Sequence, residues 1–189
     1  MLSFRITVLL AIATLFAAPV RSGPFPQADG TSAPQYTSDG QLKLPDDYRE
    51  WIYVSSGLGM SYSGSAARRE PVFDNVFVKR DSYDHFVRNG TWPDRTMFVL
   101  ELRRSSSRGS ILTNGRFQSD VSAIEASVKD EGRFPEKWAY FDFGPTGKVA
   151  SAFPKQERCF SCHQRHGQVD NTFVQFYPTL LNVVRRFTR

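Results

Sequence analysis

The ten residues RCFSCHQRHG, at positions 158–167, contain both cysteines of a chain of 189 residues. Cys159 and Cys162 are two residues apart, and His163 follows the second cysteine directly. A chain that gathers all its thiols in one CxxCH motif close to its C-terminus has to fold around whatever that motif binds. The chemistry of the motif therefore limits the fold more than any other feature of the sequence.

Four chemistries can use such a motif. A disulfide between Cys159 and Cys162 suits an exported protein but leaves His163 without a role. A redox dithiol normally lies near a βαβ pattern, which this sequence lacks. Structural zinc needs four ligands, and His166 adds only one where a second Cys/His pair would be required. Covalent attachment of a c-type haem uses every residue, with both thiols as thioethers and His163 as the proximal iron ligand. We predict one covalent haem c.

The N-terminus has the pattern of an export signal. In residues 1–23, Arg5 precedes a mostly apolar run that is followed by small residues, as in secretory signal peptides. The run is too short to span a bilayer comfortably, although an uncleaved anchor is the alternative. Residues 24–45 are rich in Pro, Gly, Ser and Gln and predict a flexible leader before a haem domain at 46–189. We expect a periplasmic or otherwise exported protein with no transmembrane span in the mature chain.

The apolar patterning predicts a mainly β (α+β) domain. The chain has 16 phenylalanines, which fit strands or an apolar pocket better than a helical bundle. Apolar, β-favouring runs bounded mostly by turn residues predict strands at 51–54, 71–79, 96–103 and 137–144. Short helices are predicted at 81–89, at 119–132 where Val121, Ile124 and Val128 have helical spacing, and from about 172 to 187, broken or started by Pro178.

The second axial position of the iron would decide the function. Electron-transfer cytochromes usually place a methionine after the motif, but Met1, Met60 and Met97 all precede it. His166 is too close to the motif to reach the opposite face of the haem, and His85 lies among polar residues. A five-coordinate iron with an open distal face is therefore expected, and such a face binds or transforms a small molecule.

The segment CFSCHQRHGQVDNTFVQFYPTL resembles the end of cytochrome P-460 and of the related β-sheet cytochromes c′. The segments LPDDYREWIYV, FDNVFV, NGTWPDRTMFVLEL and KWAYFDFG are also similar to that family, so the resemblance spans about residues 44–181. It implies a mainly antiparallel sheet with the haem against it, often in a homodimer. The family includes enzymes that oxidise hydroxylamine and relatives that bind nitric oxide without turnover.

The resemblance also implies site residues. Cys159, Cys162 and His163 match the family outright. In the enzymes a lysine is bonded to the haem ring and a distal carboxylate relays protons; Lys79 is the nearest candidate for the first role and Glu101 for the second. A solvated lysine at a strand end and a strand glutamate facing solvent are the alternatives. The basic, serine-rich segment 103–116 departs from the family pattern.

The strand TMFVLELR gives the condition under which Glu101 can act. Its alternation places Glu101 on the same face as Met97 and Val99, and Phe98 on the other face. If the haem lies on the Val99 side, Glu101 can reach the distal pocket.

Two functions follow from these expectations. One is a hydroxylamine-oxidising haem oxidoreductase that passes electrons to a redox partner protein. The alternative is a nitric oxide-binding or electron-transfer cytochrome, which an apolar distal pocket filled by Phe73, Phe77 or Phe98 would favour. The partner is a small nitrogen-containing substrate or gas in either case. The net charge of +5 comes from scattered residues without a long basic run, so nucleic-acid binding is not expected.

Overall fold

The computed structural model describes residues 33–60, 70–109, 111, 114–154 and 158–188. All of them belong to one unit, Thr31–Arg189. The predicted signal peptide at 1–23 and the first part of the predicted leader lie outside the described residues. Within the described part of the chain, no helix is long and apolar enough to cross a membrane.

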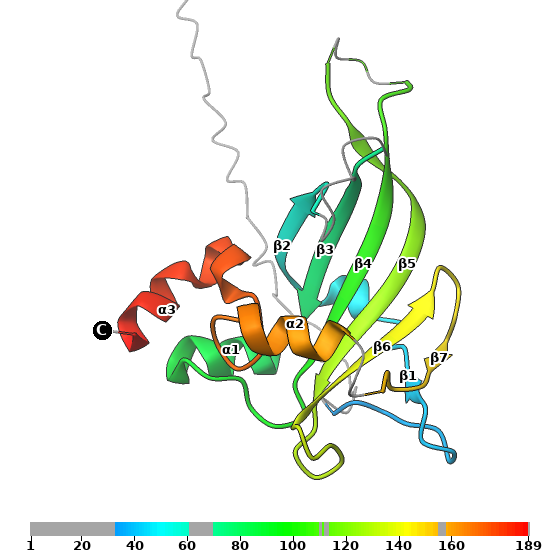
Figure 1. The fold of residues 1–189 in the computed structure, drawn as a ribbon. Helices are drawn as coiled ribbons and strands as arrows, with labels where there is room; N and C mark the ends of the chain where they lie inside the picture. Colours follow the sequence, from blue (N-terminus) through cyan, green and yellow to red (C-terminus); the bar gives the residue numbers. More distant parts are fainter. Residues whose placement is uncertain (1–32, 61–69, 110, 112–113, 155–157, 189) are drawn as a thin grey trace, which may run out of the picture. The chain divides into compact units, whose positions relative to one another are not determined.

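Five antiparallel strands form the main sheet, in the order β2-β3-β4-β5-β6 (Figure 1). Their bounds are β2 Ile52–Leu58, β3 Val72–Val78, β4 Met97–Ser106, β5 Phe117–Lys129 and β6 Trp138–Gly144. A second sheet of two strands pairs β1 (Leu42–Lys43) with β7 (Val149–Ala150). The predicted mainly β, antiparallel fold is confirmed.

The helices are short. They are α1 (Arg80–Asn89), α2 (Arg158–His166) and α3 (Leu181–Phe187), together with the single 3₁₀ turns η1 (Tyr48–Glu50), η3 (Val174–Phe176) and η4 (Pro178–Leu180). Gly90 ends α1 in the left-handed conformation that glycine favours, and its N–H donates to the Phe86 carbonyl. The helix predicted at 81–89 is confirmed.

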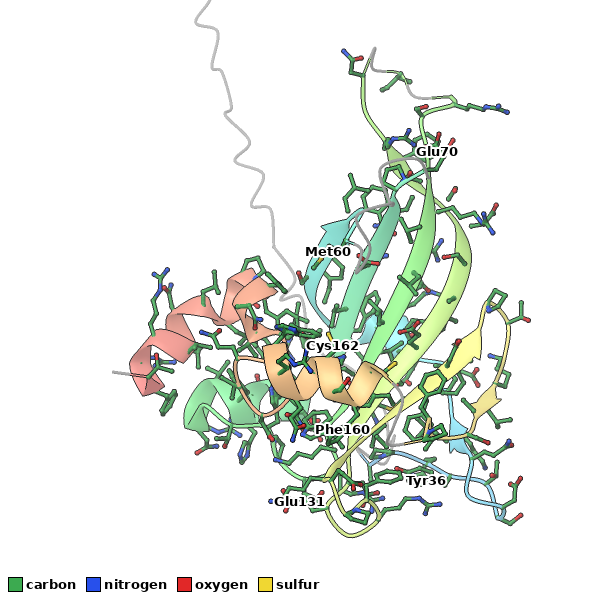
Figure 2. All side chains as sticks on the ribbon, viewed as in Figure 1. Tyr36, Met60, Glu70, Glu131, Phe160 and Cys162 are labelled. Carbon is green, nitrogen blue, oxygen red and sulfur yellow. The ribbon has the colours of Figure 1, made fainter. Side chains whose placement is uncertain are left out.

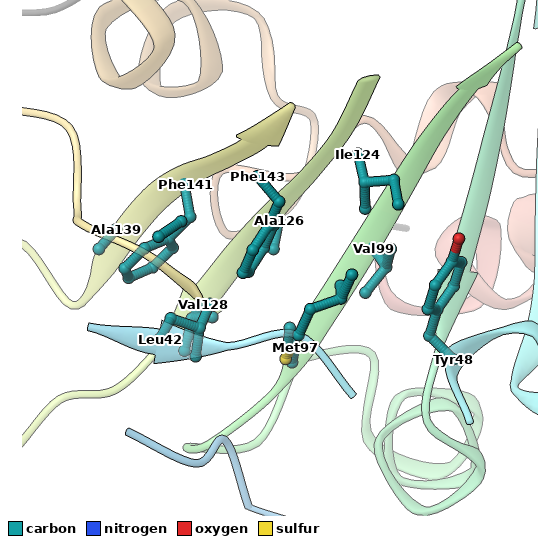
Figure 3. Packing of buried hydrophobic residues seen from close by; sticks show 12 residues of the cluster. Leu42, Tyr48, Met97, Val99, Ile124, Ala126, Val128, Ala139, Phe141 and Phe143 are labelled. Carbon is teal, nitrogen blue, oxygen red and sulfur yellow. The ribbon is translucent and has the colours of Figure 1, made fainter. Parts of the chain in front are cut away.

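The alternation of β4 divides the core between the two faces of the main sheet. One face, which we call the Met97 face, packs against β1, η1 and β7 (Figure 3). Its buried members are Leu42, Leu44, Tyr48, Met97, Val99, Ile124, Ala126, Val128, Ala139, Phe141, Phe143 and Ala150. Alternation along β4 was predicted from the sequence and is confirmed.

The opposite face, which we call the Phe98 face, carries the helices. Phe98 packs there in one apolar cluster with Phe86 of α1 and with Val183 and Val184 of α3. Cys159 and Phe160 of α2 pack against the same cluster. Complete burial of one large apolar side chain contributes roughly 1.5–3 kcal/mol, so this cluster fixes α1, α2 and α3 on one side of the sheet.

The helix predicted at 119–132 is wrong, because these residues form most of β5. Val121, Ile124 and Val128 do have helical spacing, but Ile124, Ala126 and Val128 also alternate, and all three are buried on the Met97 face. The strand lies between β4 and β6, so both of its edges are hydrogen-bonded within the sheet. This tertiary pairing overrides an ambiguous local pattern.

Two predicted boundaries also move. The helix expected over about 172–187 is broken at Pro178, as one alternative allowed: Tyr177 before it is extended, and regular α-helix begins only at Leu181. Ordered structure begins before the expected start at Asp46. Leu42 and Leu44 are buried in the core, so the end of the flexible leader was predicted too late in the chain.

Candidate functional site

The CxxCH motif lies on α2. Cys159, Cys162 and His163 are related as i, i+3 and i+4, which places the three side chains on one face of the helix. The helix packs against β6 on the Phe98 face of the sheet (Figure 1), and Figure 2 shows Cys162 and Phe160 on it. Both cysteines are half-buried thiols, and no disulfide joins them.

The ring of His163 has three close neighbours. Its Nδ1 lies 2.8 Å from the carbonyl oxygen of Asn171, and the rings of Tyr140 and Phe173 lie with their centroids 4.5 Å and 4.4 Å from its own. A carbonyl can only accept, so Nδ1 carries the proton and Nε2 keeps its lone pair. Burial lowers the pKa of His163, so the imidazole is neutral, which is the form that binds a metal.

The Tyr140 hydroxyl is a buried polar group beside the motif. Tyr140 on β6 is 6% exposed, and its hydroxyl makes no hydrogen bond with any described residue. Burial, and then the charges of Cys159 and Cys162, raise the pKa of Tyr140. An unsatisfied buried hydroxyl costs about 1–3 kcal/mol. The site therefore offers two thiols, an imidazole nitrogen and a donor to a further group, and these residues fit a covalently bound haem.

A comparison with protein families decides the identity. The family model of cytochrome P460 matches residues 45–174. The chain belongs to the cytochrome P460 family. No curated protein matches the chain. The match covers the five-stranded main sheet and the whole CxxCH motif, so this protein is a haem-binding cytochrome of the P460 family.

Glu101, the carboxylate predicted for the P460 chemistry, lies away from the motif. It is 2% exposed on the Met97 face, whereas α2 covers the Phe98 face. Tyr48 (labelled in Figure 3) and Arg103 donate hydrogen bonds to its two oxygens, and Arg49 Nε donates one over 2.8 Å. The CxxCH motif therefore lies on the face of the sheet opposite Val99 and Glu101.

The hydrogen bonds of Glu101 determine its charge. Burial by itself raises the pKa of this carboxyl, but the hydrogen bonds from Arg103, Tyr48 and Arg49 outweigh burial and hold the pKa below its ordinary value. The carboxylate is thus a charged anchor that joins β4 to η1.

Lys79, the lysine predicted as the haem cross-link, is also turned away from the motif. It precedes α1, and its Nζ lies 5.1 Å from the centre of the Trp51 ring. Trp51 packs against the Met97 cluster. The structure therefore brings Lys79 and Glu101 to one side of the sheet and the CxxCH motif to the other.

A different carboxylate lies on the face of the motif. Asp74 of β3 pairs with Leu102 of β4 and alternates with Val76 and Val78, so it belongs to the Phe98 face. Burial raises the pKa of Asp74 to about 6. Asp74 was missed from the sequence because its face follows only once the position of α2 is known.

The residues considered as a second axial ligand lie at different places in the fold. Met97 is buried on the Met97 face and cannot reach a group bound at His163. His166 is in the last turn of α2 and exposed, and His85 is on α1. Met60, labelled in Figure 2, is exposed just after β2. Its sulfur lies close to Gly57, which pairs with Asp74.

The phenylalanines proposed for an apolar distal pocket do not lie on one face of the sheet. Phe98 is buried on the Phe98 face, but Phe77 packs against the Met97 cluster. Phe73 alternates with Asp74 and so shares the face of Phe77. Of the three, only Phe98 lies on the side of the motif.

The segment 103–116 begins within β4, where Arg103 binds Glu101, and part of it lies outside the described residues.

Proposed function

We propose that the protein is an exported c-type cytochrome that carries one covalent haem and oxidises hydroxylamine. One observation carries the proposal: the two thiols and the metal-binding nitrogen of His163 share one helix face, and the His163 tautomer is fixed by the Asn171 carbonyl. Bound there, haem supplies one-electron redox chemistry and a coordination position for the nitrogen of a small substrate. Electrons would pass to an external redox partner protein.

The residues of the chain have separate tasks in this proposal. Cys159 and Cys162 tether the group through thioether bonds, and His163 binds the metal through Nε2. Tyr140 donates its hydroxyl proton, which has no acceptor among the described residues, to a polar atom at the site. Phe173 packs against the imidazole ring, as Tyr140 does. The contacts of His163 with Asn171 and Phe173 are present before the group is bound.

The proton acceptor in this proposal is Asp74 rather than Glu101. A general base works best when its pKa lies near the pH at which the enzyme operates. With a pKa of about 6, the Asp74 carboxyl is mostly ionised at pH 7 and can still be reprotonated. Glu101, by contrast, is held ionised by two arginines and a tyrosine on the other face.

A non-catalytic nitric oxide-binding or electron-transfer cytochrome is the second candidate. Leu100 and Leu102 lie on the Phe98 face next to Val76, so the side of the sheet that bears the motif is largely apolar. An apolar surface favours a neutral gas over a polar substrate. This function needs neither Asp74 nor a redox partner that accepts electrons from hydroxylamine.

Export and assembly complete the proposal. The segment 1–23 supports delivery to the periplasm or another exported location, where c-type haem attachment commonly occurs. The resemblance to the family supports a homodimer. Size-exclusion chromatography with light scattering would measure the oligomeric state directly.

Turnover of hydroxylamine separates the two candidates. The haem-loaded protein is mixed with hydroxylamine and an artificial electron acceptor, and reduction of the acceptor is followed by absorbance. The Asp74→Asn variant is measured beside it, with Asp142→Asn on β6 as a matched control. Turnover that depends on Asp74 but not on Asp142 supports the enzyme. Absence of turnover, with rapid nitric oxide binding, supports the carrier.

A further inference from the structure

We infer that Asp170 is a positioning residue for His163, and that Lys129 and Trp138 act on the site by holding Asp170. The inference rests on the proposed function, because it takes His163 as the iron ligand. It goes further in assigning the strength of the His163–Asn171 hydrogen bond to three side chains outside the motif.

The Asn171 carbonyl is presented by a tight turn. Val169 and Thr172 form an antiparallel bridge, and the Thr172 N–H donates to the Val169 carbonyl over 2.9 Å. Asp170 and Asn171 between them have φ of 49° and 58°, the left-handed conformation at both central positions of a type I′ turn. Asp and Asn tolerate this conformation better than other residues with side chains. The direction of the Asn171 carbonyl is therefore set by the turn.

The Asp170 carboxylate ties this turn to the sheet. Lys129 Nζ, at the end of β5, donates to Oδ2 over 2.6 Å, and Trp138 Nε1, at the start of β6, donates to Oδ1 over 3.2 Å. Lys129 is buried, and its Nζ also donates to the Trp92 carbonyl over 2.9 Å. A buried ammonium is stable only when charged and polar partners surround it, so this arrangement is held rigidly.

The other end of the turn is held by Trp92 and Thr172. Trp92 Nε1 donates to Thr172 Oγ1 over 2.8 Å, and that hydroxyl donates to the Val169 carbonyl over 2.6 Å. Gly167 leaves room for the contact itself: a Cβ at this position would lie 2.6 Å from the His163 carbonyl oxygen and 2.8 Å from the Asn171 carbonyl carbon. The chain is thus built so that Asn171 can come within hydrogen-bond distance of the ring.

The hydrogen bond from His163 to the Asn171 carbonyl affects how strongly the imidazole donates electrons to a bound metal. A carbonyl that accepts the Nδ1–H of a metal-bound histidine makes the imidazole a stronger electron donor, and such partners tune the metal. Loosening the turn lengthens this hydrogen bond. The iron–histidine bond of the ferrous protein then weakens, and the reduction potential of the haem rises.

The test uses Asp170→Asn and Trp138→Phe in the haem-loaded protein. Asparagine tolerates the left-handed backbone, so Asp170→Asn keeps the turn while its amide cannot accept from both Lys129 and Trp138. Trp138→Phe removes the second donor from the other side. Asp84→Asn, which breaks an exposed pair with Arg80 on α1, is the control.

Resonance Raman spectroscopy of the ferrous protein measures the iron–histidine stretch, and redox titration measures the potential. Both variants should lower the stretching frequency and raise the potential, whereas Asp84→Asn should leave both at the wild-type values. Hydroxylamine turnover should fall about 10–100-fold, the usual effect of losing an outer-shell partner. A purely structural role for Asp170 would lower thermal stability without moving the stretch or the potential.

The outcomes separate this inference from the proposed function. Haem-loaded Asp170→Asn and Trp138→Phe with wild-type stretching frequency and potential would overturn the inference and leave the proposed function intact. A wild-type protein that carries no covalent haem would overturn both. Where one variant fails to fold, the other decides, because Asp170→Asn changes the acceptor of these hydrogen bonds and Trp138→Phe removes one of its donors.

Discussion

Replacement of Glu101 by glutamine should destabilise the protein and leave its chemistry unchanged. The substitution keeps the size of the side chain but removes the charge that Arg49 and Arg103 bind. A hydrogen bond to a charged group contributes about 1.5–3 kcal/mol, and breaking a fully buried ion pair costs about 3–5 kcal/mol. The side chains of Arg49 and Arg103 are 52% and 27% exposed, so water can solvate them after the change. We therefore expect a loss of about 2–3 kcal/mol.

The effect depends on pH in a defined direction. The pKa of Glu101 is lowered in the folded protein, so its contribution is complete above the ordinary value of 4.5 and is lost as the pH falls through the folded value. Wild type and Glu101→Gln should therefore differ most near pH 7 and converge in acid.

Urea unfolding at equilibrium, followed by near-UV circular dichroism, measures the free energy. In a thermal scan, about 2–3 kcal/mol corresponds to a fall in the melting temperature of roughly 4–12 °C for a chain of this size. Glu50→Gln, an exposed glutamate on η1, is the matched control and should change stability by less than about 0.5 kcal/mol. Turnover per haem should be unchanged. A fall in turnover of 100-fold or more with unaltered stability would refute the assignment and make Glu101 the proton acceptor.

Two further predictions concern the face that bears the motif. Asp74→Asn should lower hydroxylamine turnover by about 10²–10⁴, the usual scale for a lost acid–base group, without affecting haem attachment. Because ionised Asp74 is the base, wild-type turnover should rise with pH through about 6, and a pH profile of the variant that keeps this rise would exclude Asp74. Tyr140→Phe in the haem-free chain should be at least as stable as wild type, since the lost hydroxyl has no partner among the described residues. A lower urea midpoint would mean that the hydroxyl is satisfied.

The sequence predicts elements well where one local signal dominates. The helix at 81–89 has a polar start and is stopped by Gly90, and the alternation of Met97, Phe98 and Val99 sorts β4 into two faces. Residues 119–132 were misassigned because their apolar spacing fits a helix and a strand equally, and only pairing with β4 and β6 decides between them.

Some residues of the site can likewise be predicted from local sequence, and others depend on tertiary packing. The CxxCH residues can be identified from the sequence because their chemistry depends on spacing along the chain. The face on which Glu101 and Asp74 lie depends on where α2 packs, which is a tertiary property. The partner of His163 is a backbone carbonyl, which every residue has, so no side-chain pattern could have singled out Asn171. The local sign of that turn in the sequence is the dipeptide Asp-Asn at 170–171, since both residue types tolerate the left-handed conformation that they adopt here.

Intact-mass spectrometry tests the central claim most directly. The full chain is expressed in a bacterial host with a haem-attachment system, and the mass of the exported protein is compared with that of the Cys159→Ser, Cys162→Ser double variant. We predict that the wild type exceeds the mass of its signal-cleaved polypeptide by one haem, and that the double variant has the polypeptide mass alone. A wild type without the added mass, or a double variant that keeps full covalent haem, would contradict the account.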